Sequence, residues 1–376
     1  MIDSARAAGR IRIADLVSPG IAAIRPYEPG RPIDEVEREL GIKGVIKLAS
    51  NENPLGPSPR ALEALSQELG KLSLYPDGAC YYLRRALAAQ LKVEEVEIAL
   101  GNGSNELLDL LVRAFCTPEH EVLAPSHTFV CYRLAAQMHG VGYREIPRGP
   151  DFSYSVDAFL AAVTPRTRIL FLANPDNPTG VYLGEAELLR LVRELPPQVI
   201  LAVDEAYREY VRAPDYADLL ARRCERELLV LLRTFSKIYG LAGVRCGYAI
   251  APREVVSYLD RVRNPFNVSM PAQVAARAAI GDTAHVERSQ RLNAAGMAQL
   301  QAGLERLGVR YIPSQANFLL IDVAPREGQE VFLALLRRAV IVRPLGGYRL
   351  PHHLRVTVGT AEENHQFLTE LEAVLG

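Results

Sequence analysis

The sequence predicts an α/β fold, with a mostly parallel sheet in a larger domain and a smaller α+β domain beside it. Three observations support this prediction: short apolar runs recur, helix-patterned stretches lie between several of them, and the pattern changes after residue 275. Strands that alternate with helices are typical of parallel sheets covered by helices. The 376 residues, 49% of them hydrophobic, are also too many for one compact core.

Seven apolar runs have the length of a strand. They are VEIAL (96–100), EVLAP (121–125), GYREI (142–146), RILFLA (168–173), VILAVDE (199–205), ELLVLLR (227–233) and CGYAIA (246–251). Two intervening stretches, 104–115 and 184–195, carry acidic residues early and arginines late, as the helix dipole favours. We therefore expect the larger domain to span residues 46–275.

The rest of the chain, residues 1–45 and 276–376, predicts the smaller domain. A long polar stretch over residues 282–308 has the pattern of a helix. Two strand-sized runs follow it, NFLLIDV (317–323) and LRVTVGT (354–360). Helix and strands that succeed one another in this way are typical of an α+β unit.

Charge and composition exclude several classes of function. Lys plus Arg total 43 and Asp plus Glu total 44, so the formal net charge of −1 provides no global basic field for nucleic acid. The sequence shows neither the apolar core of a signal peptide nor the roughly 18 uninterrupted apolar residues of a membrane span, so we expect a cytoplasmic protein. Five scattered cysteines and seven histidines without paired spacing predict a reducing compartment and no metal site.

The polar residues that follow the apolar runs are the candidates for function, because ligands of open α/β sheets bind at the carboxyl ends of strands. ALGNGSNELLDLL (99–111) suits an anion, although Glu106 replaces the third glycine of the dinucleotide fingerprint. LAVDEAY (201–207) ends a run with Asp204, which is either a helix cap or the partner of a buried cation. A tight turn by itself explains FLANPDNPTG (171–180).

The fourth such segment, RTFSKIYGLAGVRCGY (233–248), places Lys237 in an apolar run. An ammonium is costly to bury there, so this lysine is paired, at the surface, or held neutral for chemistry. The four segments together offer an anion nest, a carboxylate, hydrogen-bond donors and a lysine. A cofactor with a phosphate, a pyridinium nitrogen, a phenolic oxygen and an aldehyde needs these four groups.

In this order, NPDNPTG, DEAYREY and TFSKIYGLAGVRCG resemble the fold type I, pyridoxal-phosphate-dependent aminotransferases. The stretches 48–65, 75–87 and 354–360 are similar to the histidinol-phosphate aminotransferase branch, and the resemblance covers nearly the whole chain. It implies a seven-stranded, mostly parallel sheet and pyridoxal 5'-phosphate as cofactor. It also implies transamination between histidinol phosphate or imidazole-acetol phosphate and glutamate or 2-oxoglutarate, a step of histidine biosynthesis.

The resemblance implies a role for each site residue. Lys237 would hold the cofactor aldehyde as a Schiff base and move the substrate proton, in agreement with the depressed pKa of a buried lysine. Asp204 would pair with the pyridine nitrogen, while Asn177 and Tyr207 would bind the phenolic oxygen. Phe129 would stack on the ring, unless it is an ordinary core residue. The phosphate would be held by Gly103, Ser104, Asn105, Thr234, Ser236 and Arg245.

Other residues concern the oligomer and the substrate. Tyr75 matches a residue that reaches the cofactor phosphate of the neighbouring subunit, which implies a homodimer, although its YPDG context alone predicts a turn. Arg355 matches the arginine that binds the substrate anion, and Tyr27 and Arg343 match contacts to the substrate phosphate. Each arginine, taken alone, also fits a solvated strand face. Arg349 stands where many relatives have a small residue, and it would add a cation near this site.

Three rival functions stay open. An aromatic amino acid aminotransferase or a threonine-phosphate decarboxylase would keep the fold and the cofactor. A non-catalytic effector domain of a transcription regulator would need an additional basic helix-turn-helix domain. The roughly 45 residues before KLASNENPLG offer neither the length nor the charge for one, so we expect an enzyme.

Overall fold

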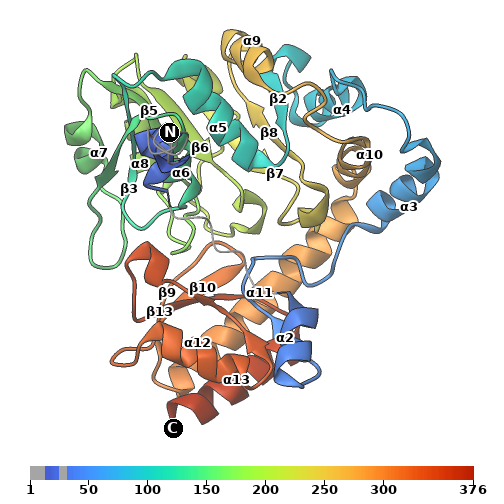
Figure 1. The fold of residues 1–376 in the computed structure, drawn as a ribbon, viewed down its shortest axis with the longest axis vertical. Coiled ribbons are helices and arrows are strands. Elements are labelled where there is room, and N and C mark those ends of the chain that lie inside the picture. Colours follow the sequence, from blue (N-terminus) through green and yellow to red (C-terminus); the bar gives the residue numbers. More distant parts are fainter. Residues whose placement is uncertain (1–12, 25–31) are drawn as a thin grey trace, which may run out of the picture.

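The structure is a computed structural model that describes residues 13–24 and 32–376. Within these ranges a seven-stranded sheet forms the upper part of the molecule in Figure 1. Its strands are β2 (Ile98–Gly101), β3 (Glu121–Pro125), β4 (Gly142–Ile146), β5 (Thr167–Ala173), β6 (Ile200–Asp204), β7 (Leu229–Thr234) and β8 (Gly247–Ile250). They lie in the order β2-β8-β7-β6-β5-β3-β4, and only β8 runs antiparallel to its two neighbours. Each strand overlaps one predicted run, so the predicted α/β fold is confirmed.

Both faces of this sheet are buried, which explains the nearly continuous apolar runs. Along β6, Leu201 and Val203 belong to the core on one face, and Ile200 and Ala202 belong to the core on the other. The second face is covered by α5 (Ser104–Phe115), α6 (Cys131–Met138) and α9 (Arg253–Val262). The first face packs against α3 (Pro59–Glu68), α4 (Tyr81–Leu91), α7 (Val156–Ala162), α8 (Glu185–Glu194) and α10 (Met270–Ala279).

A second, antiparallel sheet forms the lower part of Figure 1. Its order is β12 (Arg343–Pro344), β13 (His353–Thr357), β10 (Phe318–Asp322) and β9 (Arg310–Ile312). Its apolar face packs on α11 (Thr283–Arg306), α12 (Gly328–Leu336) and α13 (Ala361–Leu375). In Figure 1 the long helix α11 runs diagonally from the right side of the larger part down behind the smaller sheet.

The N-terminal residues contribute short elements to both parts. The helix α2 (Ile33–Leu40) buries Val36 against the C-terminal part, and α1 (Pro19–Ala22) packs on α6. β1 (Ile46–Lys47) pairs in parallel with β11 (Val340–Ile341) in a separate two-stranded sheet, and Ile46 packs against the core of the smaller antiparallel sheet. The domain limits at residues 46 and 275 stay a prediction.

Short 3-10 helices complete the described elements. They are η1 (Ile13–Leu16), η2 (Leu69–Lys71), η3 (Glu95–Glu97), η4 (Arg208–Tyr210), η5 (Arg223–Glu225), η6 (Ala242–Val244) and η7 (Gly346–Tyr348). None of the helices in the described ranges has both the length and the apolar character needed to cross a membrane.

Candidate active site

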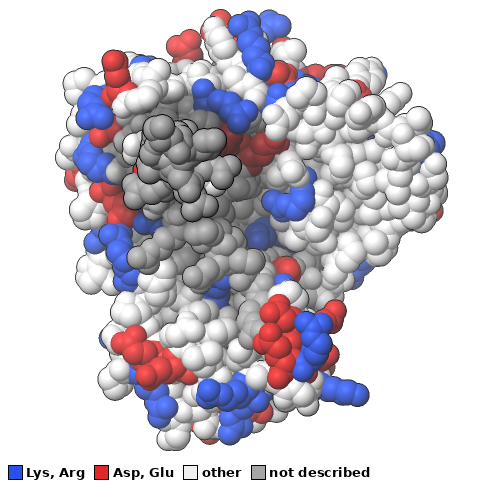
Figure 2. Space-filling model, viewed as in Figure 1, with Lys and Arg blue, Asp and Glu red and all other residues white. Residues whose placement is uncertain are grey.

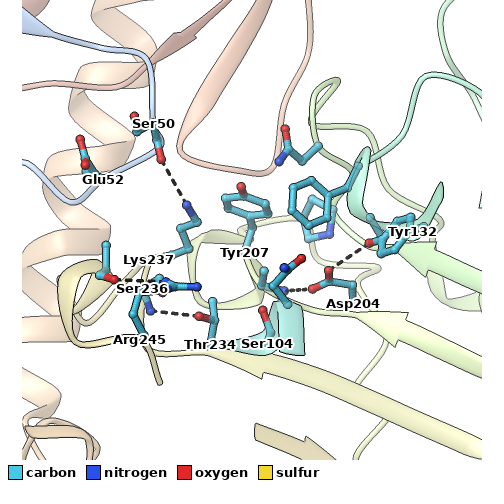
Figure 3. A pocket seen from close by; sticks show the side chains of 17 residues that line it. Ser50, Glu52, Ser104, Tyr132, Asp204, Tyr207, Thr234, Ser236, Lys237 and Arg245 are labelled. Atoms are coloured by element: carbon cyan, nitrogen blue, oxygen red, sulfur yellow. Dashed lines mark hydrogen bonds between the residues drawn. The ribbon is translucent and has the colours of Figure 1, made fainter. Parts of the chain in front are cut away.

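A cavity of about 270 Å³ opens at the carboxyl ends of β5, β6 and β7, beside the first turn of α5 (Figure 3). Ten of the predicted residues line it: Ser104, Asn105, Phe129, Asn177, Asp204, Tyr207, Thr234, Ser236, Lys237 and Arg245. The remaining lining residues are Ser50, Glu52, Tyr132, Ala173, Pro175, Ala206 and Ala242. The strand ends that were singled out in the sequence therefore meet in one place.

Lys237 enters this cavity from the loop after β7 (Figure 3). Its Nζ donates a hydrogen bond to the backbone oxygen of Ser50 at 3.2 Å and lies 5.7 Å from the centre of the Tyr207 ring. Burial lowers the pKa of Lys237 to about 8, Arg355 adds to this shift, and Glu52 opposes it. Near neutral pH the amine therefore exchanges its proton far more readily than a surface lysine does.

Asp204 ends β6 and faces the same cavity. Its Oδ2 accepts a hydrogen bond from the Tyr132 hydroxyl at 3.0 Å, and its Oδ1 accepts one from the backbone N–H of Ala206 at 3.1 Å. Burial raises the pKa of Asp204 to about 6, although both hydrogen bonds lower it. The hydrogen bond from Ala206 is of the kind that a capping aspartate makes, but the carboxylate also lines the cavity and can therefore contact a ligand.

An anion cradle lies at the amino end of α5. Gly103 has φ +77°, and a Cβ on it would clash with Nη2 of Arg245, so a larger residue here would displace the guanidinium from the helix end. Arg245 Nη1 donates to Ser236 Oγ at 3.3 Å, and Thr234 lines the adjacent wall. The helix N–H groups, two hydroxyls and one guanidinium together suit a phosphate.

The opposite wall of the cavity carries groups suited to a planar ring. Phe129 lines the cavity and also packs against the core, with its ring 5.7 Å from that of Tyr132. The Tyr207 hydroxyl accepts a hydrogen bond from Asn51 Nδ2 at 2.9 Å, so its own proton is available to an acceptor. Asn177 presents its amide between this wall and the smaller sheet.

Arg355 joins the smaller sheet to this site. It lies in β13, 7% exposed, and donates from Nη1 to Asn177 Oδ1 and from Nη2 to the backbone oxygen of Ala49, each at 2.6 Å. Arg343 is directly opposite Arg355 in the pairing of β12 with β13. Residues directly opposite one another point to the same face of a sheet, so the two guanidinium groups concentrate positive charge on that face.

Tyr75 and Arg349 do not line this cavity, and the position of Tyr27 is not described. Tyr75 is 83% exposed and stacks on Phe266 at 4.9 Å, outside the cavity of its own chain. Arg349 forms an ion pair with Glu145 at the end of β4, and its contribution of a cation near the substrate stays a prediction. Tyr27 lies outside the described residues.

The sequence did not reveal every residue of the site. Tyr132, which bonds Asp204, is stacked on Phe171 at 4.9 Å and lies three residues after Phe129 in the first turn of α6. Asn51, which bonds Tyr207, is anchored by Thr357, whose Oγ1 accepts its backbone N–H at 2.9 Å. The helical spacing from Phe129 was a usable signal for Tyr132, whereas a contact across 306 residues leaves none for Asn51.

Comparisons with known proteins agree with this geometry. A family model described as aminotransferase class I and II matches residues 43–371. The chain is 51% identical over 361 residues to the histidinol-phosphate aminotransferase of Anaeromyxobacter sp. (strain Fw109-5), covering 96% of this chain and 99% of the relative. It is 47% identical to the histidinol-phosphate aminotransferase of Moorella thermoacetica, covering 94% and 92%.

Solved structures give the same result. Histidinol-phosphate aminotransferase from Sinorhizobium meliloti, in complex with pyridoxal-5'-phosphate, has a TM-score of 0.86 at 26% identity and covers 96% of this chain and 97% of that one. A mutant aspartate aminotransferase from Thermus thermophilus has a TM-score of 0.83 at 25% identity, covering 95% and 99%. This chain belongs to the class I and II aminotransferases, and within them to the histidinol-phosphate aminotransferase family. The predicted family, fold and enzyme class are confirmed, and so is pyridoxal phosphate at the level of the family.

Proposed function

We propose that this chain is a pyridoxal-phosphate-dependent transaminase that exchanges the amino group between histidinol phosphate and 2-oxoglutarate. The observation that supports it most directly is one cavity in which Lys237, Asp204 and the cradle at Arg245 line different walls. A lysine, a buried carboxylate and an anion cradle match the aldehyde, the ring nitrogen and the phosphate of pyridoxal phosphate. The residues present therefore fit this cofactor.

Each side chain has a separate task in this proposal. When bound, the cofactor supplies an electron-accepting ring that carries the amino group from one substrate to the next. Asp204 would hold a proton on the ring nitrogen, because a buried carboxylate favours a cationic partner. Tyr207 and Asn177 would donate to the phenolic oxygen, and Phe129 would stack on the ring. Lys237, whose pKa is about 8, takes and returns the proton at the substrate Cα.

The substrate assignment depends on the arginine pair. Histidinol phosphate has no α-carboxylate, so the arginine that would grip a carboxylate binds a phosphate instead, a larger anion with more acceptor oxygens. Arg355 with Arg343 provides two guanidinium groups on facing positions of β13 and β12. Tyr27 would add a neutral donor. The similarity to histidinol-phosphate aminotransferases supports the same substrate.

A homodimer with shared sites belongs to the same proposal. Figure 2 shows few charged side chains over the region of α3 and α10, at the right of the view. Exposed apolar side chains from α3, η2, the following loop and the start of α4 include Leu62, Leu69, Leu72, Leu74, Tyr75 and Tyr82. Such a patch is typical of a surface that another chain covers. Tyr75 would then reach the cofactor phosphate of the partner subunit.

Complementation tests the shared site. Mixing inactive Lys237→Ala with a strongly impaired Tyr75→Ala variant regenerates one intact site in each heterodimer if Tyr75 acts across the interface. Subunit exchange is followed by mass spectrometry of differently tagged chains, and Lys237→Ala mixed with itself is the control. Demonstrated exchange without recovered activity would place the action of Tyr75 in its own subunit.

A substrate screen tests the reaction itself. Purified enzyme is assayed with histidinol phosphate, phenylalanine and threonine phosphate, with 2-oxoglutarate as acceptor. We expect histidinol phosphate to be preferred. Arg343→Ala should lower kcat/KM for histidinol phosphate by an amount equivalent to about 1.5–3 kcal/mol of transition-state binding, the range for a hydrogen bond to a charged group. The effect on phenylalanine should be smaller. Equal losses for both substrates would favour an aromatic aminotransferase, and release of CO₂ from threonine phosphate would favour the decarboxylase.

A further inference from the structure

Three loops of the larger sheet meet on one buried carboxylate, that of Asp176. Asp176 lies after β5 and is 0% exposed. Its Oδ1 accepts a hydrogen bond from the hydroxyl of Thr128, in the loop after β3, at 2.5 Å. Its Oδ2 accepts one from the hydroxyl of Thr179 at 2.6 Å and pairs with Nη1 of Arg148, in the loop after β4, at 2.8 Å. The carboxylate therefore ties three separate segments of chain together.

Arg148 is held as firmly as its partner. Its side chain is 2% exposed, and its Nε donates to the backbone oxygen of Phe152 at 2.6 Å. Its guanidinium lies 4.4 Å from the centre of the Tyr154 ring, and the Tyr154 hydroxyl bonds the backbone oxygen of Ala173 at 2.8 Å. Removing either charge of such a pair leaves the other buried and uncompensated.

This cluster borders the cavity through its chain neighbours. Asp176 stands between Pro175 and Asn177, and both of these residues line the cavity. Thr128 precedes Phe129, which lines it as well. Neither Asp176 nor Arg148 is among the residues that line the cavity. The bonds of Asp176 thus restrain the backbone next to two cavity walls without contact to what binds there.

We propose that Asp176 and Arg148 are positioning residues, which set Phe129 and Asn177 at the distance the cofactor ring requires. Asn177 also accepts a hydrogen bond from Arg355, so this cluster, called the Asp176 clamp below, also restrains a residue that contacts the smaller sheet. This inference rests on the proposed function. Preorganised groups lose catalytic power when they are displaced by an ångström or less, so a loosened clamp weakens binding and turnover together.

A cluster of similar composition, but more exposed to solvent, lies at the opposite end of the same strands: the Arg144 and Glu121 side chains are 41% and 12% exposed. Glu121, at the start of β3, accepts hydrogen bonds from Thr164 Oγ1 at 2.6 Å and Thr167 Oγ1 at 2.8 Å, and it pairs with Arg144 at 2.9 Å. It has the same composition of one carboxylate, one arginine and two threonines. None of its members lines the cavity. Glu121 therefore serves as a control for the structural contribution of such a cluster.

The experiment compares Asp176→Asn with Glu121→Gln in the full chain. Each substitution keeps an acceptor oxygen but leaves its arginine unpaired. We measure the dissociation constant and absorption spectrum of pyridoxal phosphate, the rate of the half-reaction with glutamate, and Tm. At a temperature where all variants are folded, Asp176→Asn should weaken cofactor binding and slow the half-reaction about 10-fold or more each, whereas Glu121→Gln should stay within about twofold.

Thr128 supplies a second pair of variants in case Asp176→Asn does not fold. Thr128→Val removes the hydroxyl at nearly constant volume and should weaken cofactor binding several-fold, and Thr128→Ser should restore it. Unchanged cofactor binding in folded Asp176→Asn or Thr128→Val would overturn the proposal, as would losses in Glu121→Gln equal to those in Asp176→Asn. A wild-type enzyme that reacts with glutamate but not with histidinol phosphate would instead refute only the proposed substrate.

Discussion

Two neighbouring carboxylates at the end of β6, Asp204 and Glu205, differ in whether an arginine of the described residues pairs with them. Asp204 faces the cavity, and the bonds found within the described residues come from the Tyr132 hydroxyl and the Ala206 N–H, neither of which carries a charge. Glu205 points to the other side of the strand and is 1% exposed. It pairs with the equally buried Arg233 at 2.8 Å.

The difference between Asp204 and Glu205 separates a structural charge from a functional one. Arg233 compensates the charge of Glu205 inside the fold, so that carboxylate needs no cation from a ligand. Burial removes water from the Asp204 carboxylate, which disfavours its charged form and raises its pKa to about 6. A buried carboxylate without a bonded cation is available to a cationic group from outside the chain. The pyridine nitrogen of the cofactor is such a group.

The largest effect should come from Lys237. Lys237→Ala removes the amine that this cavity desolvates, and we expect transamination to fall by about four orders of magnitude or more, as on loss of other covalent nucleophiles. Borohydride treatment of the wild-type holoenzyme followed by peptide mapping should place the cofactor label on Lys237. Lys47, which pairs with Glu52 at 3.0 Å, is the control lysine. A label on Lys47 would refute the assignment.

Asp204→Asn should have the next largest effect on activity. The amide cannot hold a proton on the ring nitrogen, so we expect turnover to fall by about 10²–10⁴-fold while the fold persists. Stopped-flow measurement of the half-reaction with glutamate checks this loss at saturating cofactor. Near-normal turnover with bound cofactor would show that Asp204 is only a cap.

Glu205→Gln should reduce stability but not turnover, the reverse of what we expect for Asp204→Asn. It leaves the buried Arg233 without its counter-charge, which costs about 3–5 kcal/mol of unfolding free energy in comparable buried pairs. Turnover per folded, cofactor-loaded molecule should stay within a few-fold of wild type. Urea unfolding measures the unfolding free energy, and an assay normalised by active-site titration measures turnover per loaded molecule. If Glu205→Gln abolishes turnover in a stable protein, Glu205 is not merely structural.

The part of the site that could be predicted from the sequence follows from local patterns. Apolar runs fix where β6 and β7 end, so the sequence alone predicts that Asp204 and the Lys237 loop lie at one edge of the sheet. Glycine spacing likewise indicated the cradle at Gly103. Contacts between distant segments leave no such pattern, which is why Asn51 and the Asp176 clamp were not found. The paired strands β1 and β11 have only two residues each, too few to show any periodicity.

The pH dependence of stability tests the solvation cost of Asp204. Its pKa is raised from 3.8 to about 6 on folding, so the charged form destabilises the folded apoenzyme increasingly as pH rises from about 4 to 6. Apo Asp204→Asn lacks this cost. Its unfolding free energy relative to wild type should therefore rise across that interval by at most about 3 kcal/mol and stay constant above it. A difference that does not vary with pH would mean that Asp204 titrates normally.

The smallest effect should come from Arg349, whose ion pair with Glu145 differs from the buried pair of Glu205. The Arg349 and Glu145 side chains are 61% and 26% exposed, and exposed pairs contribute about 0–1 kcal/mol because water and salt screen them. We expect Arg349→Ala to change kcat/KM for histidinol phosphate by less than about fivefold, with an effect that fades in high salt. A salt-resistant loss larger than that of Arg343→Ala would contradict this view. It would mean that Arg349 leaves Glu145 to bind the substrate phosphate, and Glu145→Gln, which frees the guanidinium, should then lower KM.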